Sequence, residues 1–165
     1  MAPRVHLLVV ANRTVDSPDL HRALKERAEE GPVHATLLMP VAHAEREEAR
    51  GRLDTALAGL RDAGIATEGM LGAADPVVAV QEAWDPARFD EVLVSTLAAP
   101  LSQWMRIDLP HRIARLIDCP VRHLETAEPE PERRAGPLPA KPRQPLLVSL
   151  LSNMHAETRR EPHAR

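Results

Sequence analysis

The residues of this chain that could carry chemistry are a few amide, hydroxyl and guanidinium side chains, most of them placed just after apolar runs. They are Asn12, Arg13, Ser95, Thr96, Ser102 and Arg106. The hydroxyl groups could hold a hydroxyl or phosphate oxygen of a ligand, and the arginines could pair with a phosphate. The alternative is structural, because serine and threonine also cap turns and helices, and a surface arginine is more often simply solvated. These residue types indicate binding of a small polar ligand.

Residues for catalysis or metal binding form no recognisable pattern. The chain contains no Gly-x-Ser-x-Gly elbow, and Cys119 precedes a proline at a strand entrance, which favours a small buried residue over a nucleophile. No two histidines are four residues apart, so the sequence holds no helical metal-binding pair. The histidines are at positions 6, 21, 34, 43, 111, 123, 155 and 163. We therefore predict no metal site and no catalytic residues, and an enzyme is only the third hypothesis.

The composition argues against several classes of partner. With one Phe, two Trp and no Tyr in 165 residues, the chain offers no platform of aromatic side chains for nucleic-acid bases. Its net charge of -3 gives no attraction to a polyanion. No apolar run approaches the roughly 18 residues that span a bilayer, and a single cysteine suits a reducing compartment. We expect a cytoplasmic protein that binds neither nucleic acid nor a membrane.

The elements around these side chains must position them, and residues 89–124 predict a strand, a helix and a second strand. The apolar run 92–94 is typical of a parallel strand covered on both faces, and it stops at Ser95 and Thr96. In open α/β sheets, ligands bind outside the carboxyl ends of the strands where the strand order reverses. The turn after this strand is therefore where we expect a site.

The helix of this unit is predicted from its caps and its periodicity. Asp108 is expected to be its N-cap, with Pro110 in the first turn, where the missing N–H costs nothing. Pro120 keeps the helix from continuing past residue 118. The predicted buried face holds Leu109, Ile113, Leu116 and Ile117.

The remaining sequence repeats the alternation of strand and helix. Further strands are predicted at residues 5–11, 33–39 and 67–71, and helices at 42–63 and 77–84. Asp16 or Ser17 is expected to cap the first helix, with Pro18 at its start. The helix 42–63 is expected to bury Ala49, Leu53, Ala56, Leu57 and Leu60. Residues 1–125 are thus predicted to form a three-layer α/β/α domain around a doubly wound, parallel, five-stranded sheet.

The composition changes after residue 125. Glutamate alternates with proline from 128 to 132, and prolines recur up to Pro145, so residues 126–165 are predicted to be a disordered, locally polyproline II tail. Residues 146–154 are an apolar exception. They are either a transient helical turn or an anchor that binds in the groove of a protein partner.

Two short motifs in this chain resemble those of the universal stress protein family, as a divergent UspA-like domain over residues 4–125. Gly72-Ala73-Ala74-Asp75-Pro76 is similar to the Gly-Asp-Pro that opens the family's third helix, and Cys119-Pro120-Val121 to the Cys-Pro-Val that opens its last strand. The resemblance implies a flavodoxin-like sheet of order 3-2-1-4-5, as in adenine nucleotide alpha hydrolases. It also implies a cytoplasmic stress-response protein and a homodimer paired through the last strand. Many members bind ATP, and by analogy Met39 lies near the base.

The chain lacks the glycine-rich motif of the ATP-binding members. That motif looks like Gly, two residues, Gly, nine residues, Gly-Ser or Gly-Thr, whereas here Ser95, Ala98 or Ala99, and Ile107-Asp108 stand in those places. Glycine lets the backbone approach a phosphate closely, and alanine or isoleucine restricts this. An Asp108 N-cap would also put a negative charge where a phosphate binds. Triphosphate binding in the family's usual manner is therefore disfavoured.

Two hypotheses of function follow. The first is a non-enzymatic stress-response or regulatory module that binds an adenine nucleotide, ATP or AMP, weakly in the crevice at the ends of the first and fourth strands. Its contacts would be Asn12, Arg13, Met39, Ser95, Thr96, Ser102 and Arg106. The second is a degenerate member that binds no small molecule and acts as an interaction scaffold through its dimer edge and its tail.

Overall fold

The apolar runs of the sequence form strands because their side chains can be buried on both faces of one sheet. The computed structural model describes residues 3–98 and 103–127, with the backbone alone at 103–108. The strands of this part are β1 (Val5–Val10), β2 (Val33–Pro40), β3 (Ala66–Gly72), β4 (Glu91–Leu97) and β5 (Val121–Thr126). Its helices are α1 (Pro18–Glu30), α2 (Arg46–Asp62), α3 (Pro76–Ala83), α4 (Gln103–Leu116) and the short 3-10 helix η1 (His43–Glu45).

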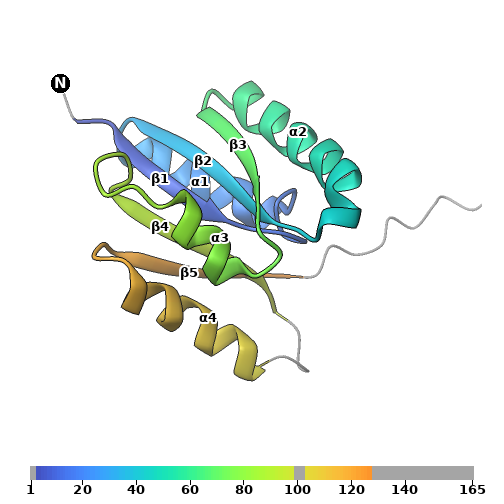
Figure 1. Cartoon of the computed structure of the whole chain (residues 1–165). Helices are drawn as coiled ribbons and strands as arrows, with labels where there is room; N and C mark the ends of the chain where they lie inside the picture. The colour runs from blue at the N-terminus through green and yellow to red at the C-terminus, as the bar shows by residue number, and fades with distance from the viewer. Residues whose placement is uncertain (1–2, 99–102, 128–165) are drawn as a thin grey trace, which may run out of the picture. The chain divides into compact units, whose positions relative to one another are not determined.

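The strands form one parallel sheet in the order β3-β2-β1-β4-β5 (Figure 1). β1 lies at its centre, where Val9 pairs with Leu37 of β2 on one side and with Leu93 of β4 on the other. This confirms the predicted fold class, a three-layer α/β/α doubly wound sheet with flavodoxin-like order 3-2-1-4-5. Because the chain moves outward from β1 to β3 and then returns to β4, the strand order reverses between β1 and β4.

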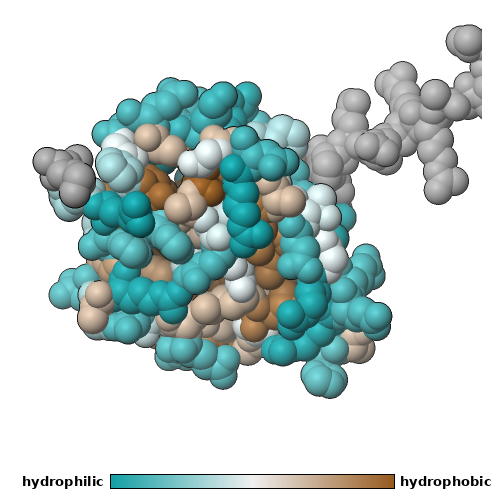
Figure 2. Space-filling view, turned by 90° about the horizontal axis from the view of Figure 1, so that it is seen from above, coloured by the Kyte–Doolittle hydropathy of each residue, from teal (hydrophilic) through white to brown (hydrophobic). Residues whose placement is uncertain are grey.

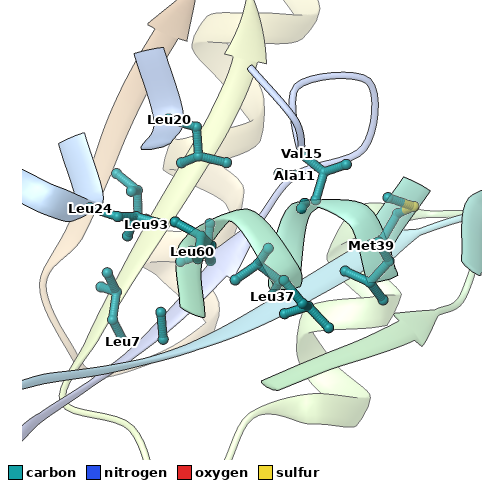
Figure 3. Close-up of a cluster of buried hydrophobic side chains, with 14 of the residues drawn as sticks. Leu7, Ala11, Val15, Leu20, Leu24, Leu37, Met39, Leu60 and Leu93 are labelled. Atoms are coloured by element: carbon teal, nitrogen blue, oxygen red, sulfur yellow. The ribbon is translucent and has the colours of Figure 1, made fainter. Parts of the chain in front are cut away.

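Two hydrophobic clusters hold the helices against the sheet. α1 and α2 cover one face, and Figure 3 shows Leu20 and Leu24 of α1 and Leu60 of α2 gathered around Leu93 of β4. α3 and α4 cover the other face, where Val80 and Ile113 are fully buried. Burial on both faces explains why the strands contain continuous apolar runs rather than alternating polar and apolar residues.

The amphipathic pattern of α2 is confirmed. All five positions predicted to be buried, Ala49, Leu53, Ala56, Leu57 and Leu60, are buried. The opposite side of the helix, including Glu47, Glu48 and Arg50, is exposed. In the view from above, the surface is mainly hydrophilic, and hydrophobic residues show between the hydrophilic ones (Figure 2).

Polar caps begin two of the helices, as predicted. The Ser17 hydroxyl accepts a hydrogen bond from the backbone N–H of Leu20 (3.1 Å), which selects Ser17 over Asp16 as the cap of α1. The Asp75 carboxylate accepts from Val77 N (2.7 Å) and Val78 N (3.2 Å) at the start of α3. In both helices a proline follows the cap, at a position whose N–H has no partner within the helix.

The predicted start of α4 is wrong. The helix begins at Gln103, so Asp108 lies inside it and is not its N-cap, and Pro110 is an interior residue. An earlier start adds backbone hydrogen bonds over more than one further turn, which offset the single bond that Pro110 removes. The negative charge of Asp108 is therefore not at a helix N-terminus, and that objection to phosphate binding no longer holds.

The predicted buried face of α4 is right at three of four positions. Ile113 and Ile117 are buried and Leu109 packs against them, but Leu116 is 40% exposed. Ile117 directly follows α4, and its N–H still donates to the carbonyl of Ile113 (3.2 Å), so both lie on the same side, whereas Leu116, the last helical residue, is turned away from that side.

The predicted end of β4 is also wrong. The strand does not stop before Ser95 and Thr96 but continues to Leu97, because β5 is long enough to pair with all three residues. Their partners in β5 are Leu124, Glu125 and Thr126. Ser95 and Thr96 therefore lie in the sheet and not in a turn.

Some predictions fall outside the described part of the chain. Ser102 and the tail from residue 128 onward, including residues 146–154, are among these. The domain boundary at residue 125 therefore stays a prediction. Among the described helices, none has both the length and the apolar character that a membrane span requires.

The interior position of Pro110 can be tested by Pro110→Ala. Within a helix, proline removes one hydrogen bond and crowds a carbonyl, so we expect this variant to raise the free energy of unfolding by about 1–3 kcal/mol. Pro76→Ala, at the first position of α3, is the matched control and should change it by less than about 0.5 kcal/mol. Urea unfolding measures both, and equal effects would argue that α4 starts near Pro110.

The close packing of α3 on the sheet can be tested at Gly72. A Cβ atom there would lie 2.7 Å from Ala79 Cβ and 2.9 Å from Leu38 Cδ1. We expect Gly72→Ala to lower the free energy of unfolding by about 1–3 kcal/mol through overpacking. Gly51, in the middle of α2, has open space around it, so Gly51→Ala should raise that free energy by about 0.5–1 kcal/mol. A neutral Gly72→Ala in urea unfolding would contradict this packing.

Candidate functional site

A cavity of about 450 Å³ lies at the carboxyl ends of β1 and β4, where the strand order reverses. Its walls are the end of β1 and the loop after it, the ends of β2 and β4, the start of α3 and the middle of α4. Its polar lining residues are Asn12, Arg13, Thr14, Asp75, Ser95, Thr96 and Arg112. Its other lining residues are Val10, Ala11, Pro40, Ala74, Pro76, Val94, Leu97 and Leu109. This is the place where doubly wound folds bind ligands.

The structure brings four of the seven predicted site residues to this cavity: Asn12, Arg13, Ser95 and Thr96. Met39 does not line it, because its side chain is fully buried in the cluster under α1 and α2 (Figure 3). The next residue, Pro40, lines the cavity instead. Ser102 lies outside the described residues, and of Arg106 only the backbone is described.

The loop after β1 is held in place by two side chains. Asn12 Nδ2 donates to the carbonyl of Pro40 at the end of β2 (2.8 Å), and Asn12 Oδ1 accepts from Arg52 of α2 (3.0 Å). Thr14 Oγ1 donates to the carbonyl of Ser95 in β4 (3.2 Å). The bonds to Pro40 and to Ser95 tie this loop to β2 and β4, the strands on the two sides of β1. The Asn12 amide is therefore a structural link.

Ser95 and Thr96 point to opposite faces of the sheet, because successive strand residues alternate. Ser95 is two residues after Leu93, so its side chain lies on the α1 side, where its buried hydroxyl has no partner among the described residues. Thr96 lies on the α4 side, where its Oγ1 is 2.8 Å from His123 Nε2. Thr96 thus offers the cavity a hydroxyl group, whereas Ser95 contributes backbone.

The charged lining residues are two arginines and one carboxylate. Arg13 and Arg112 come from the loop after β1 and from α4, and both side chains are exposed. The carboxylate is that of Asp75, and its Oδ1 is occupied by the two backbone N–H groups that begin α3. By formal charge alone, the described lining residues thus include two cations and one anion.

Three polar lining residues were not among the predicted site residues: Thr14, Arg112 and Asp75, which was expected only as a helix cap. Arg112 follows Leu109 by three residues, so both lie on the same side of α4, and this spacing could have identified it. Thr14 could have been expected from its position after β1. Its hydrogen bond to the carbonyl of Ser95 could not have been expected, because the two residues are far apart in sequence.

Among the described residues that line the cavity, none is a glycine. Among the described residues, the glycine with a positive φ is Gly64, which ends the turn after α2. A phosphate cradle made from free backbone N–H groups needs glycine-like conformations and close backbone approach. Within the described residues, the cavity therefore offers a phosphate side chains rather than such a cradle.

The remaining reactive residue types lie away from the cavity. Cys119 is half-buried against the cluster under α3 and α4, and burial raises the pKa of its thiol, which lowers its nucleophilicity at neutral pH. His6 and His34 stack with their ring centroids 5.4 Å apart. In the described ranges, no group of three His, Cys, Asp or Glu side chains could hold a metal ion.

Comparison with solved structures identifies the same fold in universal stress proteins. The universal stress protein from Archaeoglobus fulgidus in complex with dAMP is 18% identical, with a TM-score of 0.50 over 74% of this chain and 98% of that one. A universal stress protein in complex with cAMP is 20% identical, with a TM-score of 0.50 over 76% and 99%. At these identities the likeness shows the fold. No protein-family model and no curated protein matches the sequence.

The bond between Thr14 and Ser95 can be tested with a matched pair of variants. Thr14 is 2% exposed, so Thr14→Val keeps its shape but removes the donor, and we expect a loss of about 1–2 kcal/mol in the free energy of unfolding. Ser95→Ala removes a buried hydroxyl that has no described partner, so it should be neutral or stabilising by up to about 1 kcal/mol. Thermal or urea unfolding compares them, and the reverse ranking would show that the two hydroxyl roles are misassigned.

Proposed function

We propose that this chain is a non-enzymatic regulatory module, similar to universal stress proteins, that binds an adenine nucleotide weakly in the cavity at the ends of β1 and β4. The observation that carries the proposal is the cavity itself, which lies where the strand order reverses and has a volume of about 450 Å³. Volumes of this size suit a ligand of nucleotide dimensions.

The lining of the cavity suits the two ends of a nucleotide. Apolar groups such as Val10, Pro40 and Leu109 provide a surface for a base, and Arg13 and Arg112 provide cations for a phosphate. Proteins of the same fold have been solved with dAMP and with cAMP, which supports an adenine nucleotide as the ligand class. AMP fits this lining better than ATP, because a longer phosphate chain requires more donors than these side chains supply.

Weak binding follows from the backbone. In the part of the chain that the structure describes, the cavity has no lining glycine, and the N–H groups that start α3 are already bonded to Asp75. Both features remove donors that phosphate sites in parallel sheets commonly use.

A second candidate function is an interaction scaffold, and the exposed edge of the sheet favours it. β5 pairs with β4 on one side, and Arg122, His123 and Glu125 are exposed along it. An edge strand presents unpaired backbone groups that can pair with another chain. Under this proposal β5 pairs with a second copy in a homodimer, and tail residues 146–154 bind a different protein.

Isothermal titration of the full chain with AMP and ATP tests the first proposal. We expect AMP to bind with a Kd on the order of 1 mM or tighter, and ATP no more tightly than AMP. Ala74→Trp should abolish binding, because Ala74 is an exposed lining residue and an indole would fill the cavity.

Ala58→Trp, on the exposed side of α2, is the control for a large exposed side chain and should leave binding unchanged. If the unmodified chain binds no adenine nucleotide at millimolar concentration, the nucleotide part of the proposal is rejected and the scaffold is favoured.

A further inference from the structure

We infer that the outer edge of β3 is an interaction surface for a second copy of this chain, with the two β3 strands paired antiparallel about a two-fold axis at Gly69. This surface lies at the edge of the sheet opposite to β5 (Figure 1), and its use does not depend on nucleotide binding.

The backbone of β3 directs every second residue away from the sheet. Ala11 N donates to the carbonyl of Leu38, so the even-numbered residues of β2 bond to β1 and its odd-numbered residues bond to β3. Odd-numbered residues of β2 are in register with odd-numbered residues of β3, and in a parallel pair such a residue bonds to the two neighbours of its partner. The N–H and C=O groups of Thr67, Gly69 and Leu71 therefore point away from β2.

Helices pack closely on both faces of β3, so what stays accessible is its edge. A Cβ atom at Gly69 would lie 2.9 Å from Leu57 and 3.0 Å from Leu53 of α2, and one at Gly72 would lie 2.7 Å from Ala79 of α3. Gly69 is nevertheless an exposed residue. Its accessible surface is backbone at the outer edge, where it has no side chain that could obstruct an incoming strand.

The two edges of the sheet differ in their protection against pairing. The exposed residues of β5 are Arg122, His123 and Glu125, whereas β3 contains one charged residue, Glu68, and neither proline nor lysine. Charged side chains and prolines are common means by which an edge strand avoids pairing with another chain. β3 is thus the less protected edge.

The spacing of the outward residues makes this edge self-complementary. In an antiparallel pair, residues at alternate positions lie directly opposite each other and exchange both of their N–H···O bonds. With the axis at Gly69, this residue lies opposite its own copy, and Thr67 lies opposite Leu71 of the second copy. Every outward residue of the edge then meets an outward residue. A closed two-fold pair is also the commonest arrangement of homo-oligomers.

The charge on β3 is compatible with this register. Glu68 would lie opposite Met70 of the second copy, so the two carboxylates are not directly opposite each other. Within each chain, Glu68 forms an ion pair with Arg88 and accepts a hydrogen bond from Thr36 Oγ1 (2.9 Å). Each copy therefore brings its carboxylate together with a cation.

One side chain competes with the pairing. Arg61 of α2 donates from Nη2 to the carbonyl of Thr67 (3.2 Å), which agrees with the outward direction of that carbonyl. This bond occupies an acceptor that the second copy requires, and the two-fold axis repeats it at the other end of the pair. We expect a weak dimer, with a Kd on the order of 10–100 µM.

Sedimentation velocity of the full chain, from about 5 to 500 µM, measures this association. Met70→Glu places a carboxylate opposite Glu68 of the second copy, so it should weaken the dimer at least about fivefold, because the dimer contains this pair twice. Met70→Lys places an ammonium group there and should tighten it about two- to fivefold. Ala114→Glu and Ala114→Lys, at an exposed position of α4, are the matched controls for net charge and should leave the Kd unchanged.

Arg61→Ala changes an exposed side chain and should tighten the dimer about two- to fivefold, because it frees the carbonyl of Thr67. Amide hydrogen exchange gives a measurement that needs no substitution. The N–H groups of Gly69 and Leu71 should exchange more slowly as the protein concentration rises. Far-ultraviolet circular dichroism checks that the variants are folded.

Opposite effects of the two Met70 variants, with both Ala114 variants unchanged, uphold pairing through β3. A chain that stays monomeric at about 500 µM, with or without Arg61, overturns the inference and leaves the nucleotide proposal as it stands. A dimer that responds equally to Met70→Glu and Met70→Lys, with unchanged exchange at Gly69, also overturns it and favours pairing through β5.

Discussion

β1 must form hydrogen bonds to a strand on each side while both of its faces are buried, and the rest of the structure depends on this. Leu8 and Val9 are fully buried, on opposite faces of the sheet, each within a different hydrophobic cluster. Helices have to cover both faces, so the chain winds first to one edge and then to the other. The reversal beside β1 separates the loop after it from the connection after β4, and the cavity occupies the place where they part.

The sequence predicts the fold well where the signal is local. The spacing of Ala49, Leu53 and Leu60 defined the buried side of α2, and the Asp75-Pro76 pair defined the start of α3. The prediction failed where a short motif typical of a helix start lies within a longer helical segment. Asp108 and Pro110 resemble a helix start, but the helix continues through them, since a single missing hydrogen bond costs less than the loss of more than one turn of helix.

The location of the candidate cavity was predictable from the sequence, but the contacts of its lining side chains were predictable only in part. Apolar runs located the carboxyl ends of β1 and β4 to within a few residues, although β4 continues to Leu97, so Arg13 and Thr96 were expected near one another and both line the cavity. The use of each side chain depends on partners distant in sequence. Asn12 is engaged by Pro40 and Arg52, which no local pattern reveals. Met39 illustrates the same limit, because one step along a strand separates a lining residue from a core residue.

The two side-chain links of the loop after β1 affect the thermodynamics of any association at this edge of the sheet. A loop that is already ordered loses little conformational entropy when a ligand binds. This lower entropic cost partly offsets the weaker binding that results from having few hydrogen-bond donors. These links also restrict the movement of the loop when the cavity is filled. A larger response is expected from α4, which contains Pro110 and packs beside the edge strand β5.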